Sequence, residues 1–472
     1  MKRLRTNRFC VNKILIGSLT VCMLLGAFSG CGGTGTSDSS SASGPLKELS
    51  EVPEYTEEKK MWIGGWNSPP ATEAAYTYAE DGGVNMLWNI GSAQHMELAE
   101  KHGVELYPLM SSNKVLKSME EIDAAYKSFE NYSSFGGFNY VDEPGRTLFE
   151  PLGELAKNHN EKYPEIDFLV NLYPSSFYYQ NSDNAAISYE EYVEEFCEEV
   201  LTELTDSRRI LSFDHYNMQL GSTGGYLMDN WLYTVEVIAD YAKKYDADTH
   251  AFFLTTQHYN YLAQTYESLK FQANAYMAYG IEGFSHFTYA GGWDNHPVDP
   301  GTGAPAGNGA LYRAMSELDN ELLAWDDIYL AFEWQEVMQI TGSDNLEEDS
   351  FYVNNCFGNT SLSVESSDLL TNVSATKDTL IGFFEDKAGN PAMMVTNFDF
   401  PSAITGTDTE VPGAPDFNTL GTNYVKIKIE GANKVLIVRD GSLVEEEITD
   451  GTINLSLEGA GAAFVIPLRI VG

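Results

Sequence analysis

Apolar and polar residues follow one repeating order along the chain from about residue 60 onward. A short apolar or aromatic run is followed by a polar turn, and then by a longer segment whose apolar residues fall three and four positions apart. The short runs predict strands at Met61–Trp66, Val84–Ile90, Val104–Met110, Gly136–Glu143, Phe168–Pro174, Ile210–Tyr216, Ala251–His258 and Ile281–Tyr289. The longer segments predict helices at Met96–His102, Leu148–His159, Tyr189–Leu204, Trp231–Tyr245 and Thr265–Tyr279.

Eight strand–helix units in roughly 265 residues are typical of a (β/α)8 TIM barrel. An open, doubly wound sheet is the alternative architecture. No glycine-rich phosphate loop follows the first predicted strand, and the count of eight favours closure. We therefore predict an α/β fold with a barrel over residues 58–326.

The pattern changes after about residue 326. Turns rich in Gly, Asn and Asp now separate short alternating segments, of which Tyr424–Ile429 and Lys434–Val438 are two. Alternation with a period of two between turns predicts antiparallel strands. Residues 327–472 are therefore expected to form a β-sandwich.

The first 30 residues are basic and then apolar, without an acidic residue. The apolar run Ile14–Phe28 is shorter than the roughly 20 residues that span a bilayer, but it suits the core of a signal peptide. The run ends in Phe28-Ser29-Gly30-Cys31, which resembles a bacterial lipoprotein cleavage site. We therefore expect a signal peptide over 1–30, a lipid on Cys31, and a flexible Gly/Ser-rich tether over 31–57. The protein would be exported and lipid-anchored to the outer face of a bacterial membrane; an ordinary signal peptide is the alternative.

The net charge of the chain excludes some classes of binding partner. The 472 residues include 69 Asp and Glu against 28 Lys and Arg, a formal net charge of −41. Nucleic acid requires a basic surface, so it is not expected to bind, and membrane contact is expected only through the lipid. Beyond Cys31 only Cys197 and Cys356 remain, and the histidines are scattered over different strands. Neither a disulfide framework, a metal site nor a cofactor is therefore predicted.

The reacting groups of a (β/α)8 barrel lie at the carboxyl ends of its strands. Aromatic, amide and carboxylate side chains recur at the predicted ends. Aromatic faces pack against the C–H side of a sugar ring, while amides and carboxylates bind its hydroxyls. The predicted substrate-binding residues are Trp66, Asn67, Trp88, Asn89, Tyr107, Asp142, Asn171, Tyr173, His215, Tyr216, Gln257, His258, His286, Trp293 and Asp294. A single aromatic residue among them is equally well explained as a cap on the barrel core.

Glu143 is the strongest candidate for chemistry. It ends the fourth predicted strand, between Asp142 and Pro144. A carboxyl group between apolar walls keeps its proton to higher pH and can protonate a leaving-group oxygen. Asp142 would support it or bind a substrate hydroxyl. The alternative is a buried carboxylate that caps the helix beginning near Pro144.

Two segments resemble a known family. Tyr140–Pro144 resembles the Asn-Glu-Pro acid/base motif of clan A glycoside hydrolases, with Asp142 in place of the usual Asn. Phe271–Phe284 resembles the region before the eighth strand in family 42 and related β-galactosidase-like enzymes, where a Gln-bearing helix ends in Tyr-Gly, and Trp62–Trp66 fits their first strand. The resemblance covers residues 60–325, and implies a glycosidase with Glu143 as acid/base and a nucleophilic Glu at the end of the seventh strand.

The seventh strand departs from that pattern, because Thr255–Tyr259 contains no carboxylate. Asp214, at the end of the sixth strand, is the nearest alternative partner for Glu143, and Asp294 is the second candidate. Carboxyl groups about 5–5.5 Å apart would make Asp214 a nucleophile with retention, whereas about 6.5–9.5 Å would let it activate water with inversion. A hydrogen-bond acceptor without a chemical role is the structural alternative for Asp214.

The sequence therefore predicts hydrolysis of O-glycosidic bonds in an oligo- or polysaccharide at the cell surface, with Glu143 as general acid and Asp214 as nucleophile or base. A non-catalytic glycan-binding lipoprotein is the alternative, and the missing carboxylate on strand seven favours it. A surface scaffold or a different barrel hydrolase is the third possibility.

Overall fold

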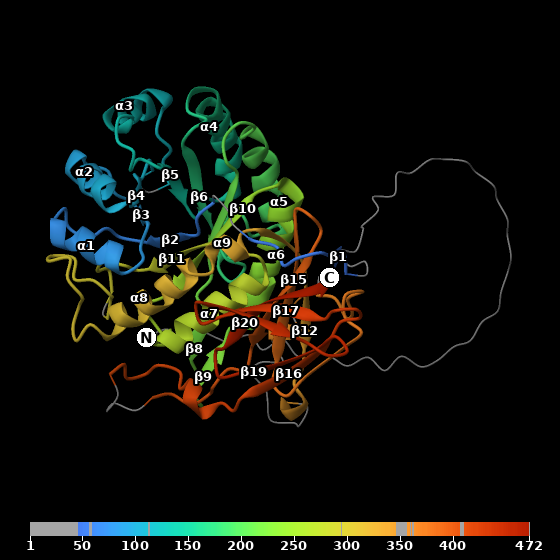
Figure 1. The fold of residues 1–472 in the computed structure, drawn as a ribbon. Coiled ribbons are helices and arrows are strands. Elements are labelled where there is room, and N and C mark those ends of the chain that lie inside the picture. The colour runs from blue at the N-terminus through green and yellow to red at the C-terminus, as the bar shows by residue number, and fades with distance from the viewer. Residues whose placement is uncertain are drawn as a thin grey trace, which may run out of the picture. The chain divides into compact units, whose positions relative to one another are not determined.

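The computed structural model describes residues 46–55, 59–111, 114–293, 295–345, 356–358, 360, 363–405 and 410–471; Figure 1 shows the fold. The predicted signal peptide, Cys31 and the Gly/Ser-rich part of the tether lie outside these residues. Within the residues described, no helix combines the length and the apolar character needed to cross a membrane.

Eight parallel strands form a closed barrel (Figure 1). They are β2 (Trp62–Gly65), β3 (Met86–Trp88), β4 (Glu105–Tyr107), β5 (Gly137–Asp142), β6 (Asp167–Leu172), β7 (Ile210–Asp214), β10 (Asp248–Leu254) and β11 (Gly283–Phe287). Their order is β4-β3-β2-β11-β10-β7-β6-β5, and the bridges Leu106↔Phe135 and Leu109↔Asn139 close the circle. The predicted barrel is confirmed, with a strand inside or overlapping each of the eight predicted ranges.

Helices follow the barrel strands and cover the outside of the barrel. They are α1 (Glu73–Asp81), α2 (Ala93–His102), α3 (Met119–Phe129), α4 (Phe149–Lys162), α5 (Tyr189–Glu199), α6 (Trp231–Tyr245), α7 (Tyr266–Ala278) and α8 (Ala310–Leu323), with a short α9 (Asp326–Tyr329) after them. The loop after β7 carries a hairpin of β8 (Met218–Leu220) and β9 (Gly225–Leu227). Several helices begin where a Ser or Thr side chain accepts a backbone N–H of the first turn, as at Ser118, Ser188 and Thr265.

Helix α7 is buried along its length rather than amphipathic, with every residue from Ser268 to Ala278 inaccessible. One side packs on the barrel, and the other is covered by the C-terminal domain. The Asn274 side-chain amide donates to the Ala460 carbonyl at 2.8 Å, and Trp334 Nε1 donates to the Ala278 carbonyl at 3.1 Å. A helix buried on two sides has no solvent-facing polar stripe, and its polar residues Lys270, Gln272 and Asn274 are hydrogen-bonded within the protein.

The C-terminal domain is an antiparallel sandwich, as predicted. Its strands are β12 (Phe332–Ile340), β13 (Asn372–Ala375), β14 (Thr379–Asp386), β15 (Pro391–Asn397), β16 (Asn423–Lys428), β17 (Lys434–Arg439), β18 (Ser442–Glu447), β19 (Thr452–Leu457) and β20 (Ala462–Ile470). One sheet has the order β12-β14-β15-β20-β17-β18, and a second has the order β13-β16-β19. Side chains such as Ile381, Val395, Val425 and Ile427 from the two sheets share one apolar core.

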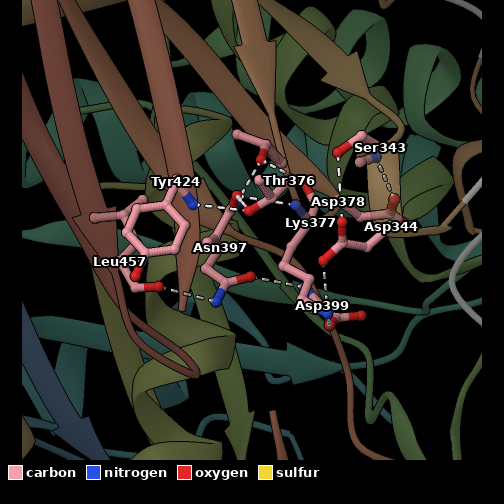
Figure 2. Close-up of polar contacts among 12 residues, drawn as sticks. Ser343, Asp344, Thr376, Lys377, Asp378, Asn397, Asp399, Tyr424 and Leu457 are labelled. Carbon is pink, nitrogen blue, oxygen red and sulfur yellow. Dashed lines mark hydrogen bonds and ion pairs between the residues drawn. The ribbon is translucent and has the colours of Figure 1, made fainter. Parts of the chain in front are cut away.

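Polar contacts also connect the two sheets (Figure 2). Asn397, at the end of β15, donates its side-chain amide to the Leu457 carbonyl of β19 at 3.4 Å. Nearby, the Lys377 ammonium lies 3.5 Å from an Asp344 carboxylate oxygen and 3.7 Å from one of Asp399. These contacts fix the turn between β13 and β14 against the end of β15.

The boundary predicted at residue 57 differs from the structure. Residues Glu48–Leu49 form β1, which pairs in parallel with the last strand, β20. The Glu48 carboxylate also lies 2.9 Å from the Arg469 guanidinium. The end of the predicted tether therefore belongs to the sandwich, because the open edge of β20 supplies backbone partners that the local sequence does not announce.

Candidate active site

Side chains at the carboxyl ends of the barrel strands enclose a cavity of about 270 Å³. They come from β2, β5, β6, β7, β10 and β11 and from the loops that follow these strands. The lining residues are Trp66, Asp142, Glu143, Asn171, Pro174, Ser176, Phe177, Asp214, Tyr216, Phe252, His258, Tyr259, Tyr261, Phe287 and Trp293. The cavity therefore lies at the end of the barrel where TIM-barrel enzymes carry their catalytic groups.

Asn171, at the inner face of β6, joins two of the three carboxylates in the cavity. Its Nδ2 donates to Asp142 Oδ1 and to Asp214 Oδ1, each at 3.1 Å. Its Oδ1 accepts from Ser212 Oγ at 3.0 Å. Because an amide N–H donor favours the charged form of a carboxyl group, Asn171 holds two aspartates in one orientation and limits their mutual repulsion.

A bulge in β5 decides that Asp142 faces the cavity. The pairing of β5 with β6 shifts register between Asn139 and Val141. Residues three apart on a regular strand point to opposite faces, yet Asn139 donates to Asn89 Oδ1 inside the barrel at 2.8 Å while Asp142 lines the cavity. The extra residue of the bulge turns both side chains inward.

Four residues at the strand ends adopt a left-handed backbone conformation. They are Asn67 (φ 66°), Asn89 (φ 63°), Glu143 (φ 48°) and Tyr259 (φ 49°). Asn tolerates this region, but Glu and Tyr do so at a cost. Such strain concentrates at functional sites. The Glu143 N–H donates to the Asn171 carbonyl at 2.7 Å, and Lys114 Nζ lies 2.5 Å from the Glu143 carbonyl oxygen, so the turn is held from both sides.

Burial and neighbouring negative charge raise the pKa of Glu143 to about 9. Burial is the largest cause, followed by the charges of Asp214 and Asp142, while the ammonium of Lys114 acts in the opposite direction. Glu143 therefore keeps its proton through neutral pH and can serve as a general acid.

The pKa of Asp214 is raised to about 7, chiefly by burial and then by the charge of Asp142. Hydrogen bonds from Asn171, from the Tyr216 hydroxyl and from its own backbone N–H act against this rise. Burial also raises the pKa of Asp142, and Asn171 again opposes the shift. Asp214 consequently loses its proton before Glu143 does. The cavity thus holds an acid and a carboxylate at mildly alkaline pH, the pair that glycoside hydrolysis requires.

Aromatic side chains make a continuous wall from the Asp214 region to solvent. The His258 ring lies 5.2 Å from the ring of Tyr216, measured between centroids, and 5.3 Å from that of Trp293. The Trp293 ring in turn lies 5.0 Å from that of Tyr259, whose side chain is 82% exposed. The faces of these rings can pack against the C–H groups of an extended polar ligand.

Of the residues predicted from sequence, the structure brings eight into the cavity: Trp66, Asp142, Glu143, Asn171, Asp214, Tyr216, His258 and Trp293. Asp294 lies outside the described residues. Asn67 and Tyr173 follow their strands without lining the cavity, and the Tyr173 hydroxyl lies 2.5 Å from Lys114 Nζ. Gln257 is exposed and also lies outside the lining.

The other predicted residues are packed in the protein interior. Trp88 and Tyr107 belong to an aromatic cluster inside the barrel, and the Tyr107 hydroxyl donates to Asp167 at the opposite end, where β6 begins. His215 Nδ1 forms a hydrogen bond with Thr234 Oγ1 behind β7. His286 Nε2 lies 2.9 Å from a carboxylate oxygen of the buried Asp319. The Asn89 side-chain oxygen accepts a hydrogen bond from the Asn139 amide. His215 and His286 face outward because side chains alternate along a strand, so a shift of one residue sends a side chain to the other face.

Several lining residues were missed from sequence, namely Pro174, Ser176, Phe177, Phe252, Tyr259, Tyr261 and Phe287. Phe252 lies inside a predicted strand, and its inward direction could be read only from the strand register. For Tyr259 the sequence did offer a signal, because this residue directly follows His258, which was predicted to bind substrate. Among the residues described, no three His, Cys, Asp or Glu side chains are grouped so that they could hold a metal ion.

Comparisons with known proteins place the chain in no family. No family model matches the sequence, and no curated protein matches it. Similar solved structures include a family 27 β-L-arabinopyranosidase from Geobacillus stearothermophilus, with 8% identity, TM-score 0.45, and coverage of 88% of this chain and 98% of that one. A glucosidase from Croceicoccus marinus has 10% identity, TM-score 0.41, and coverage of 89% and 98%. An α-L-fucosidase from Paenibacillus thiaminolyticus has 8% identity, TM-score 0.40, and coverage of 87% and 100%.

Proposed function

We propose that this protein hydrolyses O-glycosidic bonds in an oligo- or polysaccharide, with Glu143 as general acid and Asp214 as nucleophile or base. One observation carries the proposal: two buried carboxyl groups share an aromatic-lined cavity, and the pKa of Glu143 is raised further than that of Asp214. Carboxyl groups whose environments separate their pKa values are the mark of an acid and base pair.

In the proposed reaction, Glu143 gives its proton to the glycosidic oxygen as the bond to the anomeric carbon breaks. The anomeric carbon then bonds either to an Asp214 oxygen, giving a covalent intermediate that water hydrolyses, or to a water oxygen whose proton Asp214 accepts. The hydrogen bonds that Asp214 accepts from Asn171 and Tyr216 stabilise its charged form before attack.

Replacing the acid tests the proposal. Glu143→Gln keeps the shape of the side chain but cannot donate a proton, so turnover of aryl glycosides with poor leaving groups is expected to fall by about 10²–10⁴-fold. Sugar binding, measured by calorimetry, is expected to persist. Glu161→Gln on the exposed face of α4 is the matched control, and full activity of Glu143→Gln would remove Glu143 from the mechanism.

The role of Asp214 is tested separately. If it is the nucleophile, azide restores turnover to Asp214→Gly and yields a glycosyl azide of inverted anomeric configuration. If it activates water, the wild-type reaction releases a sugar of inverted configuration, visible by ¹H NMR at early times. Full activity in Asp214→Ala would exclude both roles.

Non-catalytic glycan binding is the second candidate, and one observation favours it. Gln257 stands where related hydrolases are expected to carry a carboxylate, and its side chain is exposed outside the cavity lining. A wild-type protein that binds glycans but turns over no member of a broad glycoside panel would support this candidate instead of hydrolysis.

The proposed place of action is the outer face of a bacterial membrane. The sequence Phe28-Ser29-Gly30-Cys31 after an apolar run supports export and lipidation at Cys31. Labelled palmitate is expected to enter the wild-type protein but not Cys31→Ser, and the variant is expected to leave the membrane fraction. Labelling of Cys31→Ser equal to wild type would contradict lipidation at this residue.

A further inference from the structure

A continuous row of buried polar side chains crosses the interior of the barrel below the cavity. Trp88 Nε1 donates to Ser285 Oγ at 2.7 Å. Ser285 Oγ lies 2.8 Å from His250 Nε2, and His250 Nδ1 lies 2.9 Å from Ser212 Oγ. Ser212 Oγ donates to Asn171 Oδ1 at 3.0 Å. All five side chains are buried, and the row ends at the amide that joins Asp142 to Asp214.

The strand register makes this row possible. Asn171 of β6 lies opposite Ser212 of β7, which lies opposite His250 of β10. Side chains directly opposite on neighbouring strands point to the same face, so the three form part of one inward layer of the barrel. The neighbouring strands leave room for the row. A Cβ on Gly64 would lie 2.0 Å from Ser285 Oγ, and one on Gly283 would lie 3.4 Å from the His250 ring.

The donors and acceptors of the row allow one direction along its whole length. The Trp88 indole can only donate, so Ser285 accepts from it. A hydrogen bond at every contact of the row then requires Ser285 to give its own proton to His250 Nε2. His250 then carries its proton on Nδ1 and donates to Ser212, which donates to Asn171 Oδ1. The amide N–H groups of Asn171 are thereby turned toward the two aspartates. The opposite tautomer of His250 would leave Ser212 to donate to His250 and would remove the donor from Asn171 Oδ1.

We propose that this row, from Trp88 through Ser285, His250 and Ser212, holds the Asn171 amide with its N–H groups toward Asp142 and Asp214, and that Ser212 and His250 are positioning residues for the proposed hydrolysis. The inference rests on the proposed function for its catalytic consequence. The hydrogen-bond direction itself is independent of any reaction. Such supporting shells determine how rigidly a catalytic group is held.

The row requires a neutral His250 ring, and its surroundings keep the ring neutral. Burial lowers the pKa of His250 to about 3, and the Arg208 charge acts in the same direction, while the Phe284 carbonyl acts against it. The imidazole is therefore neutral at working pH, as the row requires. The groups that act on Asp214 or respond to its charge are Asp142, Glu143, Asn171, Tyr189, Tyr192, Tyr216, Tyr261 and Tyr276.

Ser212→Ala tests the proposal, because it removes the donor to Asn171 Oδ1 together with the acceptor of the His250 Nδ1 proton. The turnover rate is expected to fall about tenfold or more, and the acid limb of the pH–rate profile is expected to move up by on the order of one pH unit, since Asp214 loses a fixed donor to its charged form. Ser212→Thr, which keeps the hydroxyl, is expected to restore the limb. Ser134→Ala removes another buried serine hydroxyl, one that donates to the Met96 carbonyl, and is the control that leaves the profile in place.

Two measurements on the free protein separate this inference from the proposed function. In ¹⁵N spectra of the wild type, the His250 ring is expected to be neutral with its proton on Nδ1. In ¹³C spectra of Asp-labelled protein, assigned with Asp142→Asn and Asp214→Asn, the Asp214 titration is expected to shift to higher pH in Ser212→Ala. If no glycoside is turned over but both spectra behave so, the row stands and hydrolysis fails. A proton on Nε2, or an Asp214 titration that Ser212→Ala leaves unchanged, would overturn the positioning role.

Discussion

Asp142 acts on both of the proposed catalytic groups. Its charge raises the pKa of both Glu143 and Asp214, and it shares the Asn171 amide with Asp214. An Asp rather than an Asn before Glu143 therefore has a physical consequence. It moves the working range of both groups toward higher pH.

The pH dependence of activity should show this influence. Turnover needs Asp214 ionised and Glu143 protonated, so kcat/KM is expected to rise through about pH 7 and fall through about pH 9. Asp142→Asn removes a negative charge beside both groups, and both limbs are expected to move down by about one pH unit. The profile belongs to the coupled groups together. A profile of Asp142→Asn with both limbs in their wild-type positions would show that Asp142 does not act on them.

The loops after the barrel strands, rather than the strands themselves, determine how far a bound substrate can extend from the carboxyl groups. The carboxyl groups lie in a cavity of about 270 Å³ at the ends of the strands. Tyr259 and Trp293 line the outer part of this cavity and are 82% and 37% exposed. A second sugar ring would therefore stack on these two side chains.

Truncating this platform should affect long substrates more than short ones. Tyr259→Ala and Trp293→Ala each remove a stacking surface of about 1 kcal/mol, so KM for an oligosaccharide is expected to rise about fivefold. KM for an aryl glycoside with a single sugar should stay within twofold if the aryl group does not reach the platform. Equal effects on both substrates would place the platform inside the first sugar site instead.

The contact between barrel and sandwich depends on a glycine in β14. A Cβ on Gly382 would lie 2.0 Å from the Ala278 carbonyl oxygen at the end of α7. The carbonyl oxygen belongs to the backbone and the backbone fixes the position of the Cβ, so neither atom can rotate away. Gly382→Ala is expected to lower the free energy of unfolding by about 1–3 kcal/mol, measured by urea denaturation. Gly421→Ala, where the nearest atom to the added Cβ is Lys377 Cε at 3.8 Å, should change it by less than about 0.5 kcal/mol.

Stability of the whole molecule is governed by buried groups that titrate in opposite directions. Burial lowers the pKa of His159 to about 4 and of His215 to about 3, and His250 behaves likewise. Below pH 6.5 these histidines bind protons in the unfolded chain but not in the folded one, so folding weakens as pH falls. Glu143 and Asp214 have raised pKa values, and their contribution is lost as pH rises through those values.

We therefore expect the free energy of unfolding to be greatest between about pH 5 and 7. A net charge of −41 adds self-repulsion above that range, and salt should screen it. Thermal unfolding across pH 4–9.5, at low and high salt, checks both points. Salt is expected to raise the Tm more at pH 9 than at pH 5. A Tm that climbs steadily from pH 6 to pH 9 at low salt would contradict the balance described above.

Most of the architecture could be predicted from the sequence. Eight apolar runs separated by helical segments favoured a closed parallel barrel over an open sheet, and alternating segments indicated a sandwich, because burial of one face imposes a period on the chain. The carboxyl ends of β5 and β7 were readable for the same reason, and with them Glu143, Asp142 and Asp214. The helix α7 was also predicted, although nothing in its pattern indicated that the sandwich would cover its outer side.

Tertiary structure alone decided which strand-end residues meet. Asn171 could be found as a polar residue on β6, but its contacts with both Asp142 and Asp214 depend on the register of three strands and on a bulge in β5. His215 and His286 were predicted at strand ends in the same way as His258, yet they point away from the cavity. Side-chain direction in a strand reverses with every residue, so a one-residue uncertainty at a short strand's end cannot be resolved without the neighbouring strands. The local sequence shows how the apolar residues are spaced, and only the closed barrel decides which side chains face inward.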